Sequence, residues 1–470
     1  MRTATLLSLL ALAATASAQD GVYVASQGNF RDGNGSVTQV PIGSQGSATQ
    51  LFRGQLGTIL QSATWYDDRL YLVGNSANKI DVIDAETNQR VGEITGGFSS
   101  PRYLEIVGFN SALRPARAYV SNQVYGGQSF VLPVDLVART TGAPIPVDGL
   151  PEAVASFTEF GPEKAYVALG TFGPSAGGLD SLAVLDTEND ALLRYIDVGC
   201  YARFVAAYVP LFSSNARFVL AFCEDTDEAV VVDVTTDAVV QRLAFGEDIG
   251  DPFGVGQSVG PGRTVPTPTR RPVPASSTFL VVTASGLAEV GQDSRTDEFR
   301  IVRRISIPEA STRPISAVGQ PTFLGPIVLG RPDPSAPFET DGTVTVHDED
   351  GRLLATYPAG IYPAHVAVDA SERFDVAAED GAAETFGLAV VGANPARSRT
   401  ALAFSLDQPA SVRVTVHDLL GRTVLAVDGG ARGAGPHRLD LDVSALAAGP
   451  YRVRLVADGR ASSAPLTVVR

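Results

Sequence analysis

The 470-residue sequence is poor in the residues that most often carry catalysis or bind transition metals. It has four histidines, two cysteines, one tryptophan and two lysines. Only His347 and His365 lie in the main body of the chain, and the other two histidines are in its C-terminal fifth. A zinc site built from histidines or thiolates is therefore not expected. The sequence also places no histidine at a suggestive spacing from a serine or cysteine, which is weak evidence against a hydrolase.

Positive charge and long apolar stretches are scarce as well. The 36 Lys and Arg residues are outnumbered by 51 Asp and Glu residues, which leaves a net charge of −15. Contacts with phosphates need clustered cations, so no nucleic-acid partner is expected. No stretch approaches the roughly 20 apolar residues of a transmembrane helix, so no transmembrane segment is predicted.

The N-terminus has the layout of a secretory signal peptide. Arg2 precedes an apolar stretch from Leu6 to Ala14, and small residues follow at Ala16 and Ala18. We therefore predict a signal peptide over 1–18, with cleavage after Ala18 and export of the remaining chain.

One short pattern, an aromatic or apolar residue within a β-branched run, recurs through most of the chain. Seven copies are present: VYVAS at Tyr23, LYLVG at Tyr71, AYVSN at Tyr119, AYVAL at Tyr166, FVLAF at Phe218, FLVVT at Phe279 and IVLGR at Ile327. Their steps are 48, 48, 47, 52, 61 and 48 residues. A near-constant step of this size indicates an array of similar units.

A second pattern follows several of these copies. It consists of an apolar run, an Asp with Thr, Asn or Gly, and another apolar run, as in the segments 80–94, 182–196, 229–243 and 344–357. Such segments are typical of β-hairpins. About four short strands in each repeat of about 48 residues predict an all-β chain, with a seven-bladed β-propeller over 19–370. The Pro-rich stretch 256–277 is predicted to be a loop that does not pair as a central strand.

These units resemble the YVTN-type β-propeller repeats of surface-layer and other exported proteins. The copy at Tyr119, which reads YVSN, and the hairpin VIDAETNQRV carry the resemblance. It covers about three quarters of the chain and implies a fold rather than an activity.

The two cysteines, Cys200 and Cys223, are expected to form a disulfide. An even number of cysteines in an exported chain favours a bridge over free thiols. They flank two predicted consecutive antiparallel strands, 201–210 and 216–225, which places them nearly opposite each other across the ladder. Two unrelated buried thiols are the alternative.

Metal-binding candidates are few. Asp32, Asn34 and Ser36 alternate within FRDGNGSV, as ligands of a calcium loop do, but the closing Glu of the helix-loop-helix form is missing. A hairpin turn explains this segment more simply. No cofactor is predicted, and calcium is the only ion that the loop suggests. The acidic runs 223–229 and 347–351 are interpreted as solvated turns.

The C-terminal part differs from the repeats. The acidic, Ala-rich stretch 371–391 is predicted to be a linker, and the alternating segments of 392–470 predict a small antiparallel β-sandwich of immunoglobulin-like type. Within this domain His417 stands next to Asp418, as in a catalytic pair. Because Val412, Val414 and Val416 share one strand face, His417 falls on the opposite, polar face, and the pair cannot act on one centre.

Residues 392–470 resemble the C-terminal sorting domain, type A, of cargo proteins of the type IX secretion system. The matching positions are Asn394, Pro395, Asp418, Gly421, Arg422, Gly449 and Tyr451. The resemblance implies recognition by the type IX machinery and transport across the outer membrane, to the cell surface or the medium. Such domains are usually removed, and the cargo is then attached to surface glycolipid or released.

Three functions stay open for the predicted propeller. The first is a non-catalytic module that binds a protein, a glycan or a small molecule. The second is an enzyme with a site in the channel, such as a lactonase-like hydrolase or a quinone-dependent dehydrogenase. The third is a structural surface-layer component. Three or more carboxylates converging at the channel mouth would favour the enzyme, whereas a channel lined by apolar and amide groups would oppose it.

Overall fold

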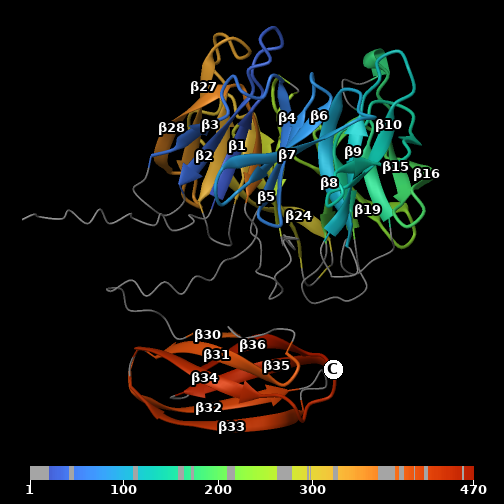
Figure 1. Cartoon of the computed structure of the whole chain (residues 1–470). Helices are drawn as coiled ribbons and strands as arrows, with labels where there is room; N and C mark the ends of the chain where they lie inside the picture. The colour runs from blue at the N-terminus through green and yellow to red at the C-terminus, as the bar shows by residue number, and fades with distance from the viewer. Residues whose placement is uncertain are drawn as a thin grey trace, which may run out of the picture. The chain divides into compact units, whose positions relative to one another are not determined.

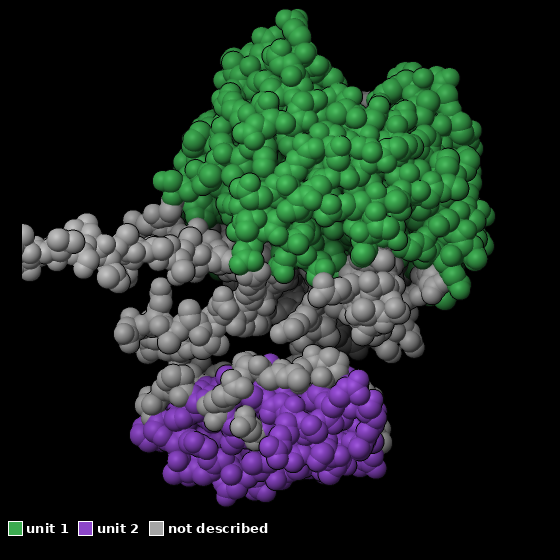
Figure 2. All heavy atoms as spheres, in the orientation of Figure 1, with its two compact units in different colours: residues 1–373 green, residues 374–470 purple. Residues whose placement is uncertain are grey.

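The computed structural model consists almost entirely of β-strands (Figure 1). It describes residues 21–41, 47–109, 115–156, 164–170, 174–208, 218–253, 255–261, 278–293, 296, 298–320, 326–368, 387–390, 396–406, 408–417, 422–433, 435–457 and 460–470. The chain divides into two compact units, 1–373 and 374–470, coloured separately in Figure 2. Over the described ranges, none of the helical structure is long and apolar enough to cross a membrane. The predicted signal peptide lies outside these ranges.

The strands in the described part of unit 1 form seven antiparallel sheets. Sheet one joins β29 (Pro363–Val368), β1 (Gly21–Ser26), β2 (Ser36–Pro41) and β3 (Thr49–Leu51). Sheet two joins β4 (Leu60–Tyr66), β5 (Arg69–Gly74), β6 (Lys79–Asp84) and β7 (Gln89–Thr95). Sheet three joins β8 (Pro101–Phe109), β9 (Pro115–Asn122) and β10 (Phe130–Asp135), with β11 (Thr140–Thr141) and β12 (Ile145–Pro146) both paired to β10.

The remaining four sheets of unit 1 have four strands each. Sheet four joins β13 (Val154–Ser156), β14 (Lys164–Ala168), β15 (Ser181–Asp186) and β16 (Ala191–Asp197), with the 3-10 turn η1 (Pro174–Ala176) before β15. Sheet five joins β17 (Ala202–Tyr208), β18 (Phe218–Cys223), β19 (Glu228–Asp233) and β20 (Ala238–Ala244). Sheet six joins β21 (Val259–Pro261), β22 (Thr278–Thr283), β23 (Gly286–Gln292) and β24 (Phe299–Ser306). Sheet seven joins β25 (Ala317–Gly319), β26 (Ile327–Arg331), β27 (Asp341–His347) and β28 (Leu353–Ile361).

The first strand of each sheet, here called its inner strand, contacts the inner strands of neighbouring sheets. β29 contacts β4, β4 contacts β8, β8 contacts β13, β13 contacts β17, β21 contacts β25, and β25 contacts β29. Sheets five and six are linked by the Ser258 hydroxyl, which donates to Glu224 Oε1 at 2.5 Å. The sheets thus form a ring that closes on itself. In Figure 1 the blue strands β1–β3 accordingly lie beside the orange strands β27 and β28.

The second strand of each sheet carries one copy of the recurring motif. β1, β5, β9, β14, β18, β22 and β26 contain or begin at the seven positions from Tyr23 to Ile327. These strands are almost fully buried, because both of their faces pack against neighbouring sheets. The near-continuous apolar sequence of each copy follows from this position, since a strand covered on both faces needs no polar alternation.

The tyrosine of the motif contacts the hairpin of the following sheet. The Tyr119 hydroxyl donates to Asp190 Oδ1 at 2.6 Å, and the Tyr166 hydroxyl donates to Asp237 Oδ1 at 2.7 Å. Both aspartates have a positive φ, near 50°, in the turn between the third and fourth strands. Asp adopts this conformation more readily than most residues. In these two copies the two recurring sequence patterns are therefore the two sides of one contact between sheets.

The Pro-rich stretch departs from its prediction in one respect. Within the stretch 256–277, which was predicted to be a loop, Val259–Pro261 forms β21 and pairs with β22 as an inner strand. A Cβ added to Gly260 would lie 2.0 Å from the Val318 carbonyl oxygen of sheet seven, and one at Gly256 would lie 1.9 Å from the Ser316 carbonyl oxygen. Glycine at these positions lets the two inner strands approach closely. Residues 262–277 lie outside the described ranges.

Unit 2 contains two antiparallel sheets in its described part. One joins β30 (Gly387–Val390), β31 (Arg399–Leu406) and β34 (Gly435–Asp442), and the other joins β33 (Thr423–Arg432), β32 (Ala410–His417), β35 (Gly449–Ala457) and β36 (Arg460–Val468). Both sheets contribute buried side chains to one core, including Leu402, Val414, Leu441 and Leu455. β30 falls within the stretch 371–391 that was predicted to be a linker, so the last residues of that stretch are part of the folded unit.

Candidate functional site at the mouth of the ring

One end of the ring gathers polar and aromatic side chains from several sheets. Because neighbouring strands are antiparallel, the inner strands begin where the second strands end. The residues at these positions, and in the loops beside them, line a cavity of about 460 Å³, here called the mouth pocket. Its lining consists of Gln27, Phe30, Asn75, Ser100, Arg102, Gln123, Tyr125, Val255 and Phe338.

The loop between β1 and β2 brings Gln27 and Phe30 to the mouth pocket. Gly28 has φ = 81°, and a Cβ there would lie 2.5 Å from the Gly35 nitrogen, so the turn needs glycine. The loop also contains the predicted calcium candidates. Asn34 Oδ1 accepts the Asn29 N–H at 2.8 Å, and Asp32 Oδ2 accepts the Asn29 side-chain N–H at 2.9 Å.

The third calcium candidate differs from the first two in its position. Ser36 is the first residue of β2 and is buried. The oxygens of Asp32 and Asn34 thus accept hydrogen bonds within the turn, and the resulting network holds the turn that carries Phe30.

A buried ion pair forms the floor of the mouth pocket. Arg102, at the start of β8, donates from Nε to Glu152 Oε2 at 2.7 Å and from Nη2 to Glu152 Oε1 at 2.6 Å. Arg102 Nη1 donates to Gln61 Oε1 at 2.6 Å, and Gln123 Nε2 donates to Glu152 Oε2 at 2.8 Å. Burial alone would lower the pKa of Arg102, but the charge and hydrogen bonds of Glu152 outweigh it and raise the pKa. Arg102 therefore keeps its positive charge beside Glu152.

Tyr362 supports the side of the mouth pocket formed by Phe338. The two rings stack with centroids 4.7 Å apart. The Tyr362 hydroxyl donates to buried Asp251, and its carbonyl oxygen accepts the Gln27 N–H at 2.8 Å. Tyr362 is fully buried and has φ = 52°, an unusual conformation for a bulky residue. Such backbone persists where surrounding contacts determine it, and it is frequent at ligand sites.

A second ion pair lies beside the first in the ring. Arg203, on β17, donates from Nη2 to Glu224 Oε1 at 2.8 Å, and its guanidinium lies 4.6 Å from the centroid of the Phe204 ring. Glu224 belongs to the acidic run 223–229 that was interpreted as a solvated turn. The structure instead turns this carboxylate towards Arg203, so the interpretation is wrong for Glu224.

Tyr103 and His365 face each other within the ring. Their ring centroids are 5.6 Å apart, and Tyr103 also makes an edge contact with Phe204. Burial lowers the pKa of His365 to about 3, so its imidazole is neutral at ordinary pH. The Tyr103 hydroxyl and His365 Nδ1 have no hydrogen-bond partner among the described residues. A histidine with so low a pKa has little affinity for a proton and is a poor general base near neutral pH.

Three carboxylates, Glu152, Glu224 and Asp251, lie near the starts of the inner strands. Their hydrogen-bond partners decide whether they are available for catalysis. Glu152 and Glu224 are bound by arginines, while Asp251 accepts the N–H groups of Val255 and Gly256 at 3.0 and 2.7 Å as well as the Tyr362 hydroxyl. Carboxylates occupied in this way offer few lone pairs to a metal or a substrate.

Glu105 is a further carboxyl group on the inner strand β8, three residues after Arg102. It accepts the Ser156 N–H at 3.1 Å, and the Ser156 hydroxyl lies 3.0 Å from the same oxygen. Burial nevertheless raises the pKa of Glu105 to about 7, while the hydrogen bonds from Ser156 partly oppose the change. The folded protein therefore binds a proton at Glu105 more tightly than the unfolded chain does.

This pKa predicts a specific loss of stability as the pH rises. The contribution of Glu105 to the free energy of unfolding is complete below about pH 4.5. It is lost as the pH rises towards 7, because ionisation of this carboxyl group then stabilises the unfolded chain more than the folded one. Glu105→Gln, which keeps the acceptor for Ser156, is expected to remove this pH dependence, worth about 3 kcal/mol. Urea unfolding of both proteins at several pH values between 4 and 8 measures it. Parallel stability profiles would contradict the prediction.

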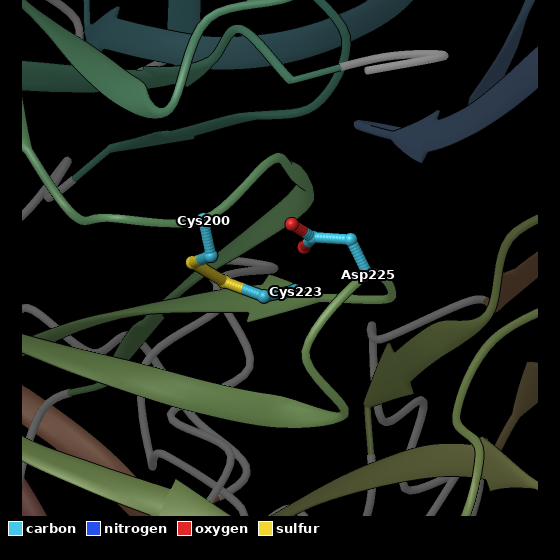
Figure 3. A group of neighbouring side chains, drawn as sticks. All are labelled: Cys200, Cys223 and Asp225. Atoms are coloured by element: carbon cyan, nitrogen blue, oxygen red, sulfur yellow. A yellow bond between two sulfur atoms is a disulfide. The ribbon is translucent and has the colours of Figure 1, made fainter. Parts of the chain in front are cut away.

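Cys200 and Cys223 are joined by a disulfide (Figure 3), with their Cα atoms 5.8 Å apart. Cys223 ends β18 and Cys200 precedes β17, and both lie in the largest buried cluster of unit 1. Asp225 lies nearby, and the three side chains have the spacing of a metal site. The sulfurs are bonded to each other, however, and supply no thiolate. Asp225 Oδ1 accepts the Tyr201 N–H at 3.1 Å.

Two serines have the G-x-S-x-G spacing of a hydrolase nucleophile, and sequence reasoning missed both. Ser175 lies in η1 and is exposed, whereas Ser258 is buried next to β21. The Ser258 hydroxyl donates to Glu224, which also binds Arg203. Neither serine stands on a strand-to-helix turn, and neither has a histidine partner in the described part of the chain. The spacing alone therefore does not make a nucleophile.

The remaining histidines of interest have structural partners. His347 is buried, with Nδ1 3.0 Å from the Gly351 carbonyl oxygen and Nε2 3.0 Å from Thr345 Oγ1. On β32 the three valines are buried and His417 lies on the other face, 2.9 Å from Thr415 Oγ1. Asp418 lies outside the described residues.

Comparisons with known proteins give similarity of structure only. No protein-family model matches the chain, and no curated protein matches it by sequence. Among solved structures, Kuenenia stuttgartiensis hydrazine synthase has 16% identity and a TM-score of 0.42 over 66% of this chain and 90% of that one. The dihydro-heme d1 dehydrogenase NirN has 12% identity and a TM-score of 0.44 over 74% of each chain. The Cps50 (Swd1) beta-propeller domain of Myceliophteria thermophila has 10% identity and a TM-score of 0.45 over 66% and 89%.

Proposed function

We propose that the chain is an exported seven-bladed β-propeller that binds a ligand in the mouth pocket without chemically changing it. The observation that carries this proposal is the pairing of charges around the mouth pocket. Arg102, Glu152 and Asp251 are each held by protein partners, and the other lining residues contribute aromatic rings, amides, the Ser100 hydroxyl and the Val255 side chain. Such a pocket has groups that recognise a molecule and no free acid, base or nucleophile to act on it.

The ring of inner-strand contacts supports the propeller. Seven sheets with the recurring motif on each second strand match the seven repeats in number and order. β29, from the end of unit 1, completes sheet one by pairing with β1. When strands from the two ends of a domain pair in one sheet, the first and last blades are joined and no sheet edge stays open between them.

We propose further that residues 392–470 are a type IX sorting domain with a β-sandwich fold. Two sheets around one core support the sandwich. Of the matching positions, Arg422 is exposed beside β33, Gly449 begins β35, and the Tyr451 hydroxyl donates to the Ala447 carbonyl oxygen at 2.9 Å. Asn394, Pro395, Asp418 and Gly421 lie outside the described residues. Recognition by the secretion machinery would deliver the propeller to the cell surface or the medium.

Truncation tests the sorting assignment. In a host with type IX machinery, a chain that ends at residue 393 is expected to stay in the periplasm, whereas the full chain reaches the surface or the medium. Immunoblots of periplasm, outer membrane and medium measure this. A chain without residues 1–18 is the control and is expected to remain in the cytoplasm. Surface arrival of the truncated chain in normal amounts would refute the assignment.

A further inference from the structure

The charges around the mouth pocket limit the kind of ligand it can bind. The guanidinium of Arg102 is engaged by both oxygens of Glu152 and by Gln61. An anionic ligand that took over these donors would leave the Glu152 carboxylate, which is fully buried, without its partner. A cationic ligand would meet Arg102 at the floor. The ligand that fits is therefore uncharged.

Three aromatic rings give the mouth pocket flat apolar surfaces. Phe30 is 69% exposed and Tyr125 is 61% exposed, which is high for aromatic residues of a folded domain. Phe338 lies against Tyr362 and Phe253 and is fixed by them. Rings that stand at the rim of a cavity offer their faces to a ligand with an apolar face of its own.

The polar lining requires a ligand that has both hydrogen-bond donors and hydrogen-bond acceptors. Gln27, Asn75 and Gln123 carry amides and Ser100 a hydroxyl. Amides and hydroxyls both donate and accept. Of these residues, Asn75 and Ser100 are partly exposed, so their polar groups can be reached from the mouth pocket. A purely apolar ligand would leave such groups unpaired, at a cost in affinity.

We propose that the mouth pocket binds the uncharged end of a carbohydrate chain. A neutral sugar residue has apolar C–H faces for Phe30 and Tyr125, and hydroxyls that both donate and accept for the amides. The cavity of about 460 Å³ lies in the range of small-ligand sites, roughly 300–1,000 Å³. The left-handed Tyr362 and the glycine turn at Gly28 hold the lining in place before binding. This inference rests on the proposed binding function and names its ligand class.

Binding measurements on the purified mature chain test the proposal. The probes are neutral pentasaccharides of glucose, xylose, mannose and N-acetylglucosamine, an acidic pentasaccharide of galacturonic acid, and a pool of uncharged hexapeptides. Saturation-transfer NMR detects binding and calorimetry measures Kd. We expect at least one neutral pentasaccharide to bind and to be recovered unchanged, and the acidic one not to bind.

Variants locate the site. Tyr125→Ala and Phe30→Ala are each expected to weaken binding at least tenfold, whereas Tyr125→Phe keeps the ring and most of the affinity. Tyr195→Ala, at a 37% exposed tyrosine on the outer strand β16, is the matched control and should bind normally. Unchanged unfolding midpoints show that each variant is folded.

Each outcome decides between the two proposals. Peptide binding that is lost in Tyr125→Ala, without any binding of neutral sugars, would overturn the carbohydrate assignment and leave the binding function in place. Failure of all probes would overturn both. Sugar binding that is unaffected by Tyr125→Ala and Phe30→Ala would place the sugar elsewhere and overturn the assignment to the mouth pocket.

Discussion

Replacing Arg102 by methionine is expected to lower the free energy of unfolding by about 3–5 kcal/mol. The substitution leaves the Glu152 carboxylate buried with one remaining side-chain donor, Gln123. It also removes the Arg102 N–H group that donates a hydrogen bond to Gln61 Oε1. An uncompensated buried charge is among the most destabilising changes in a protein interior, because the ion has lost water without gaining a partner. Chemical denaturation monitored by fluorescence and circular dichroism measures the loss.

A double variant and a surface control separate charge from packing. Arg102→Met with Glu152→Met removes both charges, and is expected to restore most of the lost stability, since no buried ion remains. Arg53→Met breaks the exposed pair between Arg53 and Asp341, whose side chains are 51% and 42% exposed, and should cost less than about 1 kcal/mol. Equal losses in Arg102→Met and Arg53→Met would show that the buried pair contributes no more than an exposed one.

Removal of the disulfide is expected to lower the free energy of unfolding by about 3 kcal/mol. The bridge joins residues separated by 23 positions, and a loop of this size restricts the unfolded chain by about that amount. The double variant Cys200→Ala, Cys223→Ala leaves no free thiol. Both sites lie within an apolar cluster, where the apolar alanine side chain is compatible with its surroundings.

Chemical denaturation again measures the effect, with the parent protein examined under reducing conditions as the comparison. Reduction of the parent should reproduce most of the loss seen in the double alanine variant, because both changes release the same loop. A double alanine variant as stable as the oxidised parent would contradict the prediction. Loss of stability on reduction without a matching loss in the variant would instead show that the two buried thiols, rather than release of the loop, destabilise the reduced protein.

The second strands and the inner strand β17 could be predicted from the sequence, whereas the shortest inner strands could not. Second strands such as β5 and β9 are buried on both faces, so each repeat carries a continuous apolar run that is easy to recognise. Inner strands such as β13, β21 and β25 have three residues each. Three residues are too few to show the alternation of apolar and polar residues that identifies a strand. For this reason Val259–Pro261 was interpreted as part of a loop.

The mouth pocket was missed for the same reason. Its polar residues occur singly, at the starts of inner strands or at the ends of second strands, and come together only when the ring closes. Gln61, Arg102 and Arg203 are each the second residue of an inner strand. An alignment of the repeats on their inner strands would have shown a polar second residue in β4, β8 and β17. The pairing of Arg102 with Glu152, 50 residues later, still needs the structure.

Local patterns gave a correct prediction in one other place and a wrong one in another. The alternation of Val412, Val414 and Val416 correctly assigned His417 to the polar face of β32, because the period of a strand is fixed by its geometry. The interpretation of the acidic run at 223–229 failed at Glu224, since the sequence gives no sign that a turn residue will reach an arginine on a neighbouring strand.

The pairing of β1 with β29 has a consequence for how the protein is made. Val22 pairs with Val368, so sheet one lacks its inner strand until nearly all of unit 1 has been synthesised. At about 5–20 residues per second, roughly 20–70 s separate the two strands on the ribosome. During that interval β1 has one unpaired edge and the ring cannot close. β29, the last strand of unit 1 to emerge, therefore sets the moment at which the ring can close.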